Sequence, residues 1–472
     1  MSFQRTHSPL NDWLALTRFS NLPTIVTNSL VGVALVLAID RAWGVPGVIA
    51  MTPVPLTAAP DVALAMCAFY LAGMVLNGIV DRKIDARERP LRPIASGRIA
   101  LPWAWTVFII LFFFGFFLRP SWGSTPAPVA AAALIGVWLH ARANTMRSHI
   151  LLRLARGWTL VAVIAAFWWV IDLVVREPFD LSAMKEHRRL AIHAGHLAMN
   201  LPVLAIAFSL VGYNLLHTGS AYAIGFLALC RACIPIAMVA ALLVPHGIVT
   251  DILSRADTLG WTSLSMLGTI ALCAAALAAH TILLSVVARR EVAGHDKVGD
   301  SRYFCATCGY ALVSLPAATC SECGCDLTTT PPRGERSLRA RARFTLPLLA
   351  LLPLLPLLVI PFVVGTNSSY QGSALPSASL GEFFAGPWHQ WSLVSHAMLF
   401  ISAVWFVIAS TRGLSAALSH PSRRPAGIAA LIAAFALLDA CAAAALNIPP
   451  IALACIALWF VTRFAQRRIA GS

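Results

Sequence analysis

The sequence predicts an all-α polytopic membrane protein with about twelve transmembrane helices and one small cysteine-rich insertion. Hydrophobic residues make up 58% of the 472 residues and charged residues only 12%. The apolar residues gather in long runs, which is the pattern of a chain that crosses a bilayer repeatedly. A polar stretch with two close cysteine pairs separates the eighth run from the ninth. The fold class is therefore a helical membrane bundle with a small polar domain inserted into it.

Twelve apolar runs are the candidate transmembrane segments. They cover residues 19–40, 62–81, 101–118, 126–141, 157–175, 199–216, 220–244, 262–288, 344–365, 393–410, 425–445 and 447–465. The first 18 residues contain Arg5, Asp12 and Arg18 and lack an apolar core, so we expect no cleavable signal peptide.

Basic residues in the connections predict the orientation, because cytoplasmic loops are enriched in Lys and Arg. Loops 82–98 and 289–343 hold six and nine such residues, whereas 366–392 holds none. Both termini and both basic loops are then cytoplasmic in a multi-pass protein of the cell inner membrane. Loop 176–198 does not fit this orientation, since it carries four basic residues but is assigned to the outer side. The net charge of +15 follows from the same bias, so no nucleic-acid partner is expected.

An acidic motif follows the second run, in the stretch NGIVDRKIDARERPLRPIASG from Asn77 to Gly97. Asn77, Asp81 and Asp85 are spaced at i, i+4 and i+8, so a continuing helix places them on one face. Mg²⁺ binds in proteins through one or two carboxylates and completes its shell with water and phosphate oxygens. The spacing therefore predicts a magnesium site at the end of this helix.

A basic loop comes directly after the acidic motif. Four arginines, whose guanidinium groups suit bidentate phosphate binding, stand there: Arg87, Arg89, Arg92 and Arg98. Pro90 and Pro93 end the helix, and Gly97 permits a turn. A metal site beside an arginine cluster at a membrane surface indicates binding of a lipid diphosphate. The alternative is a helix end with solvated charges.

The segments NGIVDRKID and RPLRPIASG resemble the first motif of the UbiA family of intramembrane prenyltransferases over about twenty residues. The resemblance implies a UbiA-like helical bundle and the transfer of a prenyl group, dependent on Mg²⁺, from an isoprenoid diphosphate to a membrane-embedded acceptor. It assigns a catalytic role to Asn77, Asp81 and Asp85 and a substrate-binding role to Arg89, Arg92 and Ser96. The alternative is a non-catalytic UbiA-like scaffold or transporter that binds isoprenoid or related lipids.

A second aspartate motif in the family implies a second magnesium site, for which Asp296 and Asp300 in DKVGD have the spacing. Glu291 precedes them, and the alternative is a solvated linker.

The stretch 213–232 resembles the family's tyrosine-plus-basic loop, which implies substrate binding by Tyr213, His217 and Arg231. The family usually has Lys or Arg where this chain has His217. For Arg231 the alternative is snorkelling to the interface.

Four cysteines form the pairs CATC and CSEC, separated by eleven residues: Cys305, Cys308, Cys320 and Cys323. This spacing is typical of a zinc ribbon, in which four thiolates close a tetrahedral structural site. A disulfide fits poorly with the reducing cytoplasm. A closed Cys₄ site leaves no position for catalysis, so the ribbon is a structural unit or a docking site for a protein partner.

Three domains follow from these features. Residues 1–300 are the prenyltransferase-like membrane domain, with 119–198 as an insertion, and residues 301–330 are the zinc ribbon. Residues 331–472 carry four further apolar runs, which either complete the bundle or form a fused unit.

Overall fold

The computed structural model is a bundle of long helices, and it describes part of the chain. The described residues are 8–43, 56–118, 136, 200–214, 222–243, 256–293, 303–304, 311–312, 333–334, 346–360, 393–419 and 423–469. The expected runs at 126–141 and 157–175 lie outside these residues, apart from position 136.

Helices account for nearly all of the described residues. The labelled α-helices are α1 (Pro9–Leu16), α2 (Pro23–Trp43), α3 (Ala59–Glu88), α4 (Leu101–Phe117), α9 (Tyr222–Leu243), α11 (Ala256–Ala293), α15 (Leu393–Ser419), α16 (Arg424–Ala445) and α17 (Pro449–Arg468). Short 3₁₀ turns are η1 (Phe19–Asn21), η2 (Leu56–Ala58) and η4 (Leu352–Leu354). Two further apolar helices cover Asn200–Asn214 and Leu346–Ile360.

The polytopic all-α fold class is confirmed. Seven described helices are long and apolar enough to cross a membrane, and three more are shorter apolar helices. Together they correspond to ten of the twelve expected spans. Helices suit this role because a backbone in lipid must satisfy its own hydrogen bonds. The orientation of the chain and the kind of membrane remain predictions.

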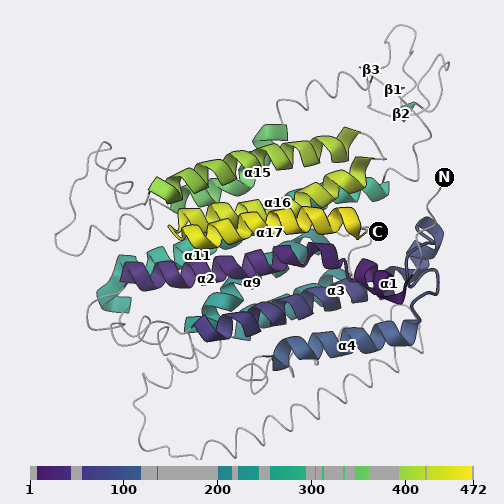
Figure 1. Ribbon diagram of the computed structural model, residues 1–472, viewed down its shortest axis with the longest axis horizontal. Helices are drawn as coiled ribbons and strands as arrows, with labels where there is room; N and C mark the ends of the chain where they lie inside the picture. The colour runs from purple at the N-terminus through teal and green to yellow at the C-terminus, as the bar shows by residue number, and fades with distance from the viewer. Residues whose placement is uncertain are drawn as a thin grey trace, which may run out of the picture.

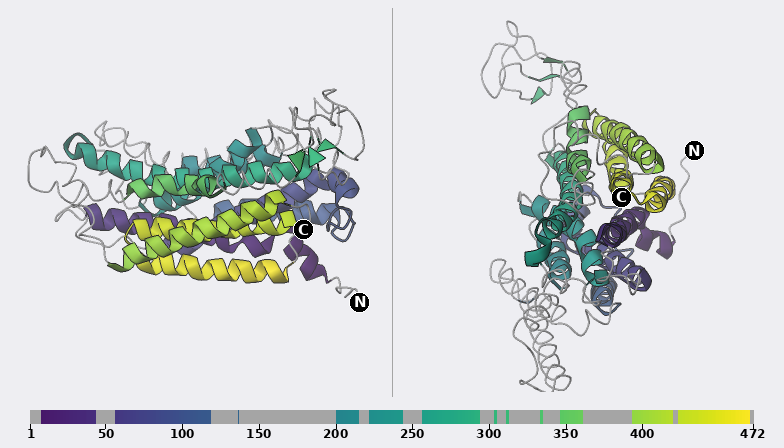
Figure 2. Two further views of the ribbon diagram at one scale, coloured as in Figure 1. Left: turned by 90° about the horizontal axis from the view of Figure 1, so that it is seen from above. Right: turned by 90° about the vertical axis from the view of Figure 1, so that its left-hand side faces the viewer.

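The helices run side by side with their long axes roughly aligned (Figure 1). Seen end-on, α15, α16 and α17 lie on one side of the bundle and α3 and α4 on the opposite side, with α2, α9 and α11 between them (Figure 2). One hydrophobic core extends through all of these helices, from Ile25 of α2 and Phe69 of α3 to Phe435 of α16. The C-terminal helices are thus packed into the same core as the N-terminal ones.

Aromatic rings join α3 to α4. Phe69 of α3 meets Phe112 and Phe116 of α4 edge to face, with ring centroids 5.9 and 4.9 Å apart. Gly115 leaves room for the Phe69 ring, because a Cβ there would lie 2.8 Å from its Cζ atom. This packing fixes α3, the helix that carries the acidic motif, against a neighbour along the buried face.

Three two-residue strands form a small antiparallel sheet in the order β2-β1-β3. They are β1 (Tyr303–Phe304), β2 (Ala311–Leu312) and β3 (Arg333–Gly334). The strands β1 and β2 lie within residues 301–330 and β3 lies just after them, and the sheet is at the same end of the molecule as α1 (Figure 1). The four cysteines of the expected zinc ribbon lie outside the described residues, so the zinc site stays a prediction.

Close helix contact in the C-terminal hairpin depends on glycine, and this gives a first prediction. A Cβ at Gly427 of α16 would lie 2.5 Å from the Ala417 nitrogen and 2.6 Å from the Gly413 oxygen, both backbone atoms of α15. Small residues allow this approach in lipid, where packing drives association. We expect Gly427→Ala to lower the melting temperature of the purified protein, because the two helices must separate.

The matched control is Gly225→Ala in α9, where an added Cβ meets nothing within 4 Å. That variant should melt at or slightly above the wild-type temperature, since alanine favours helix. Equal melting of the two variants would show that the α15–α16 contact is looser than described.

Candidate functional site

The acidic motif lies on the last turns of α3, which continues unbroken through all three residues to Glu88. Asp81 and Asp85 are buried, with 9% and 5% of their surface exposed. The Asn77 amide donates to an Asp81 carboxylate oxygen over 3.0 Å. The spacing of four residues therefore places the three oxygen-bearing side chains in a stack, as expected for one helix face.

The basic loop folds back onto the end of α3. The Arg89 amide still donates to the Asp85 carbonyl, and Pro90 then ends the helix. The chain closes through turns in which the Ser96 amide donates to the Arg92 carbonyl over 2.8 Å. Gly97 has a φ of +78°, a conformation that favours glycine. The loop thereby returns Arg92 to Asp85.

The central contact of the site joins Arg92 to Asp85. One guanidinium nitrogen of Arg92 donates to both Asp85 carboxylate oxygens, at 2.9 and 2.8 Å. Both side chains are largely buried, with 12% and 7% of their surface exposed. The Arg92 Nε atom is also buried and has no hydrogen-bond partner among the residues described. Arg92 therefore retains a donor, directed into the protein, that its contact with Asp85 does not use.

Asp85 and Arg92 both line a small cavity of about 20 Å³. The other lining residues are Leu16, Arg18, Met74, Asn77, Gly78, Pro93 and Ile94. A cavity of this volume holds little more than one water molecule. This enclosed space is smaller than a diphosphate, although Asp85, the Asn77 amide and two arginines of the site already meet there.

Arg18 is a site residue that the sequence analysis treated only as part of a polar N-terminus. It stands between α1 and η1 with a φ of +47°, an uncommon left-handed conformation for arginine. Its carbonyl accepts a 3.4 Å hydrogen bond from the Tyr70 hydroxyl of α3. The sequence feature that could have indicated a role for Arg18 is its position directly before the first apolar run, where a basic side chain lies at the membrane surface.

Helix α1 forms one wall of the cavity and is tied to the basic loop. Ser8 caps it by accepting from the Asn11 amide over 3.2 Å. Asp12 accepts from Arg98 Nε over 2.9 Å, and Arg98 also donates to the Leu91 carbonyl. Arg98 was expected to bind phosphate, but here it holds α1 against the loop.

Gly78 allows α1 to approach α3 closely. An added Cβ at this position would lie 2.6 Å from a methyl carbon of Leu16 and 3.3 Å from one of Ile94. Gly78 therefore has a packing role, because it lets Leu16 and Ile94 lie against α3 at the wall of the cavity.

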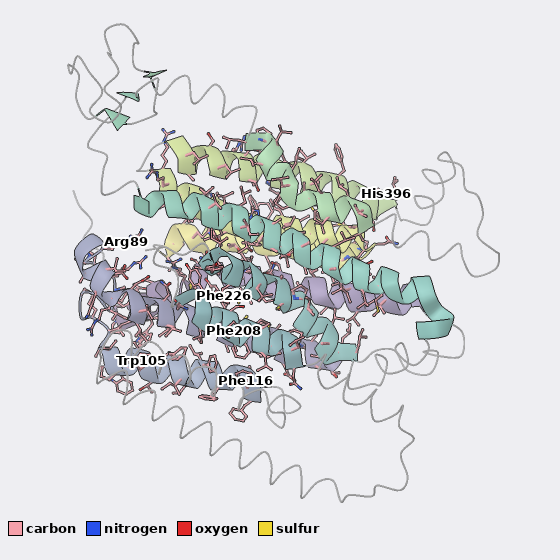
Figure 3. The ribbon with its side chains drawn as sticks, turned by 180° about the vertical axis from the view of Figure 1, so that it is seen from behind. Arg89, Trp105, Phe116, Phe208, Phe226 and His396 are labelled. Atoms are coloured by element: carbon pink, nitrogen blue, oxygen red, sulfur yellow. The ribbon has the colours of Figure 1, made fainter. Side chains whose placement is uncertain are left out.

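The other expected substrate-binding residues are spread over the molecule. Ser96 is exposed and donates to the Pro93 carbonyl, while Arg89 lies at the end of the bundle where α3 ends (Figure 3). Tyr213 is half-buried near the end of the helix Asn200–Asn214. His217 lies outside the described residues. Arg231 is on α9, where it contacts α2 and α16 instead of lining the cavity.

The second aspartate motif is not described, since Asp296 and Asp300 follow the end of α11. Glu291 is in the last turn of that helix. In Figures 1 and 3, α11 ends at the same end of the bundle as α3.

The donor set of the first motif suits Mg²⁺. Two carboxylates and one amide supply oxygen ligands only, which hard cations prefer, and Mg²⁺ needs few protein ligands because it keeps several waters. No group of three or more His, Cys, Asp or Glu that could hold a metal occurs within the described ranges. Asp81 and Asp85 with Asn77 match the smaller ligand number of a magnesium–diphosphate site.

The fold and the site together define a multi-pass membrane protein with an acidic helix face and a basic loop at one end of the bundle. Residues 30–183 match the model of the UbiA prenyltransferase family. The resemblance read from the motif is confirmed for this region of the chain.

A curated relative supports the same family. Protoheme IX farnesyltransferase 2 of Pseudoalteromonas translucida (strain TAC 125) is 31% identical over 136 residues, which are 28% of this chain and 40% of the relative. The match thus spans less than half the length of that relative. No solved structure matches the chain significantly.

The Asp12–Arg98 pair predicts how firmly α1 is held. We expect Asp12→Asn to raise amide hydrogen exchange in residues 9–16 by up to about fivefold, because a partly exposed ion pair contributes under about 1 kcal/mol. The control is Asp61→Asn, an exposed acid in the first turn of α3. Unchanged exchange in the Asp12 variant would mean that Leu16 packing alone holds the helix.

Proposed function

We propose that the chain transfers a prenyl group from an isoprenoid diphosphate to a lipophilic acceptor within the membrane. The observation that carries the proposal is the cavity at the end of α3, where Asp85, Asn77 and two arginines, Arg18 and Arg92, lie together. Acids for a metal and guanidinium groups for phosphate are the parts that this chemistry requires. The match of residues 30–183 to the UbiA family model and the similarity to a farnesyltransferase support it.

Asp81 and Asp85, with the Asn77 amide, would hold Mg²⁺, and Asp296 and Asp300 would hold a second ion. The metal would neutralise charge on the diphosphate leaving group. The chain's own residues contribute the rest. The arginines bind phosphate oxygens, and the burial of Asp81 and Asp85 strengthens the electrostatic interactions that these acids make.

Substrate binding requires the Asp85–Arg92 contact to open. Each group is the other's partner in the described conformation, and the cavity between them is too small for a diphosphate. Arg92 would exchange the carboxylate for phosphate oxygens, and its unused Nε donor gives it a second bond to offer. Asp85 would then be available as a metal ligand. This exchange links the binding of the diphosphate to the completion of the metal site.

The test is a binding and turnover experiment on the full-length protein. Titration with farnesyl and geranylgeranyl diphosphate, each with and without Mg²⁺, measures recognition, and release of diphosphate in native membranes measures turnover. We expect Asp81→Asn and Asp85→Asn to reduce turnover by at least about 100-fold, since each removes charge stabilisation of the leaving group. Correct membrane insertion should persist.

Asp61→Asn is the control, since this exposed acid lies at the opposite end of α3 and should leave activity unchanged. Full activity in either motif variant would exclude the metal role. Mg²⁺-dependent binding without turnover in the wild type would favour the second candidate, a non-catalytic UbiA-like protein that binds isoprenoid lipids.

We also propose that the cysteine pairs hold a structural zinc ion next to the sheet β1–β3. Replacing Cys305 and Cys308 with serine should release one zinc per chain, as measured by metal analysis of the purified protein, while diphosphate binding persists. The reason is that four thiolates saturate a tetrahedral site and leave none open for chemistry. Wild-type protein without zinc, or with iron, would contradict the ribbon.

A further inference from the structure

A buried polar cluster lies among α2, α9 and α16. Thr24 and Asn28 belong to α2, Arg231 to α9 and Asp439 to α16. Asn28 is fully buried and Asp439 is 1% exposed. All four residues belong to candidate membrane spans, where charged groups are costly and seldom occur without a partner.

Hydrogen bonds connect the two charges through Asn28. Arg231 Nη1 donates to Asn28 Oδ1 over 2.8 Å, and the Asn28 amide nitrogen donates to Asp439 Oδ2 over 2.7 Å. Arg231 further donates to the Thr24 hydroxyl, at 3.2 and 3.3 Å. The asparagine therefore turns its acceptor to the cation and its donor to the anion, and only one orientation of the amide satisfies both neighbours.

Helix α16 supplies an aromatic face to the same arginine. The Arg231 Cζ atom lies 4.6 Å from the centre of the Phe435 ring, within the range of a cation–π contact. Phe435 precedes Asp439 by four residues, so both lie on one face of α16. Asp439 is the single acid in the sequence of α16 and α17. This face of α16 therefore interacts with the positive charge of Arg231 twice, through the Phe435 ring and, by way of Asn28, through the Asp439 carboxylate.

Other polar contacts follow the same interface. Gln466 of α17 donates to Asn21 Oδ1 over 3.0 Å, and the His280 ring of α11 contacts the Leu431 carbonyl of α16 at 2.9 Å. Several independent contacts therefore join the C-terminal helices to the N-terminal ones.

We propose that the faces of α2 and α9 with Thr24, Asn28 and Arg231 form a docking surface whose partner is α16. The hydrogen-bond bridge through Asn28, from Arg231 to Asp439, selects this helix and its register. Residues 393–468 are then an obligatory part of the bundle and not a fused unit. Arg231 is a packing residue in this arrangement, because its donors are directed to α2 and its face to Phe435. The proposal is independent of prenyl transfer.

The physical reason is an asymmetry between buried charges. Removing one member of a buried pair leaves the other charge without compensation, which is strongly destabilising, whereas moving or removing both together is tolerated. At a helix–helix interface without charges, the effect of one substitution on stability would not depend on the other substitution in this way. Coupling between positions 28, 231 and 439 is therefore the property to measure.

The experiment exchanges the acid and the amide in the full-length protein. Asn28→Asp alone places two acids side by side, and Asp439→Asn alone leaves Arg231 without an acid. We expect each to raise the unfolding equilibrium constant at least about tenfold. The double variant restores one acid and one amide in contact and should return to within about twofold of wild type. Thermal and denaturant unfolding in detergent, with hydrogen exchange of residues 431–445, give the readout.

A second pair covers the case in which the single variants do not fold. Arg231→Met combined with Asp439→Leu removes both charges, and this chain should fold and protect α16, whereas Arg231→Met alone should not. Asp61→Asn serves as the control for a remote exposed acid. Wild-type stability of the single variants, or double variants no more stable than the worse single, would overturn the proposal.

Discussion

The contact between Asp85 and Arg92 holds together the end of α3, the loop that follows it and the cavity between them. Helix α3 ends at Glu88, so Asp81 and Asp85 lie one or two turns before its end, while Arg89, Arg92 and Arg98 follow it. Folding of the loop by turns at Ser96 and Gly97 returns Arg92 to Asp85, and the two side chains close on each other at 2.8 Å. Two buried opposite charges stabilise each other only when they are well paired. The geometry of the whole site depends on this pair.

Under the proposed function, Asp85 and Arg92 would have different partners before and after substrate binding. In the described conformation the arginine compensates the acid, and the cavity admits little more than water. Under the proposed function, a diphosphate with its metal would bring both a cation for the acid and an anion for the arginine, so both partners would be replaced at once. The site can therefore stay neutral in the absence of substrate, which matters for two charges that are largely shielded from water.

Local patterns in the sequence predicted much of the fold. Apolar runs found ten of the described helices, and the spacing of Asn77, Asp81 and Asp85 predicted their common face, because both depend on neighbours a few residues apart. Contacts between distant segments were not predictable in this way. Asp12 pairs with Arg98, and Asn28 with Asp439, which is 411 positions away. An apolar helix with one acid does not show in its sequence which partner the acid will meet.

The position of Asp439 has a consequence for how the chain is made. Arg231 enters the membrane about 200 residues before its distant counter-charge has been synthesised. At about 5 to 20 residues per second, this interval lasts roughly 10 to 40 s. During that time the docking surface of α2 and α9 lacks α16, and Thr24 and Asn28 are the groups available to accept hydrogen bonds from the guanidinium. The Thr24 hydroxyl and the Asn28 amide thus first stabilise the Arg231 guanidinium before α16 is present, and later form part of the interface with α16.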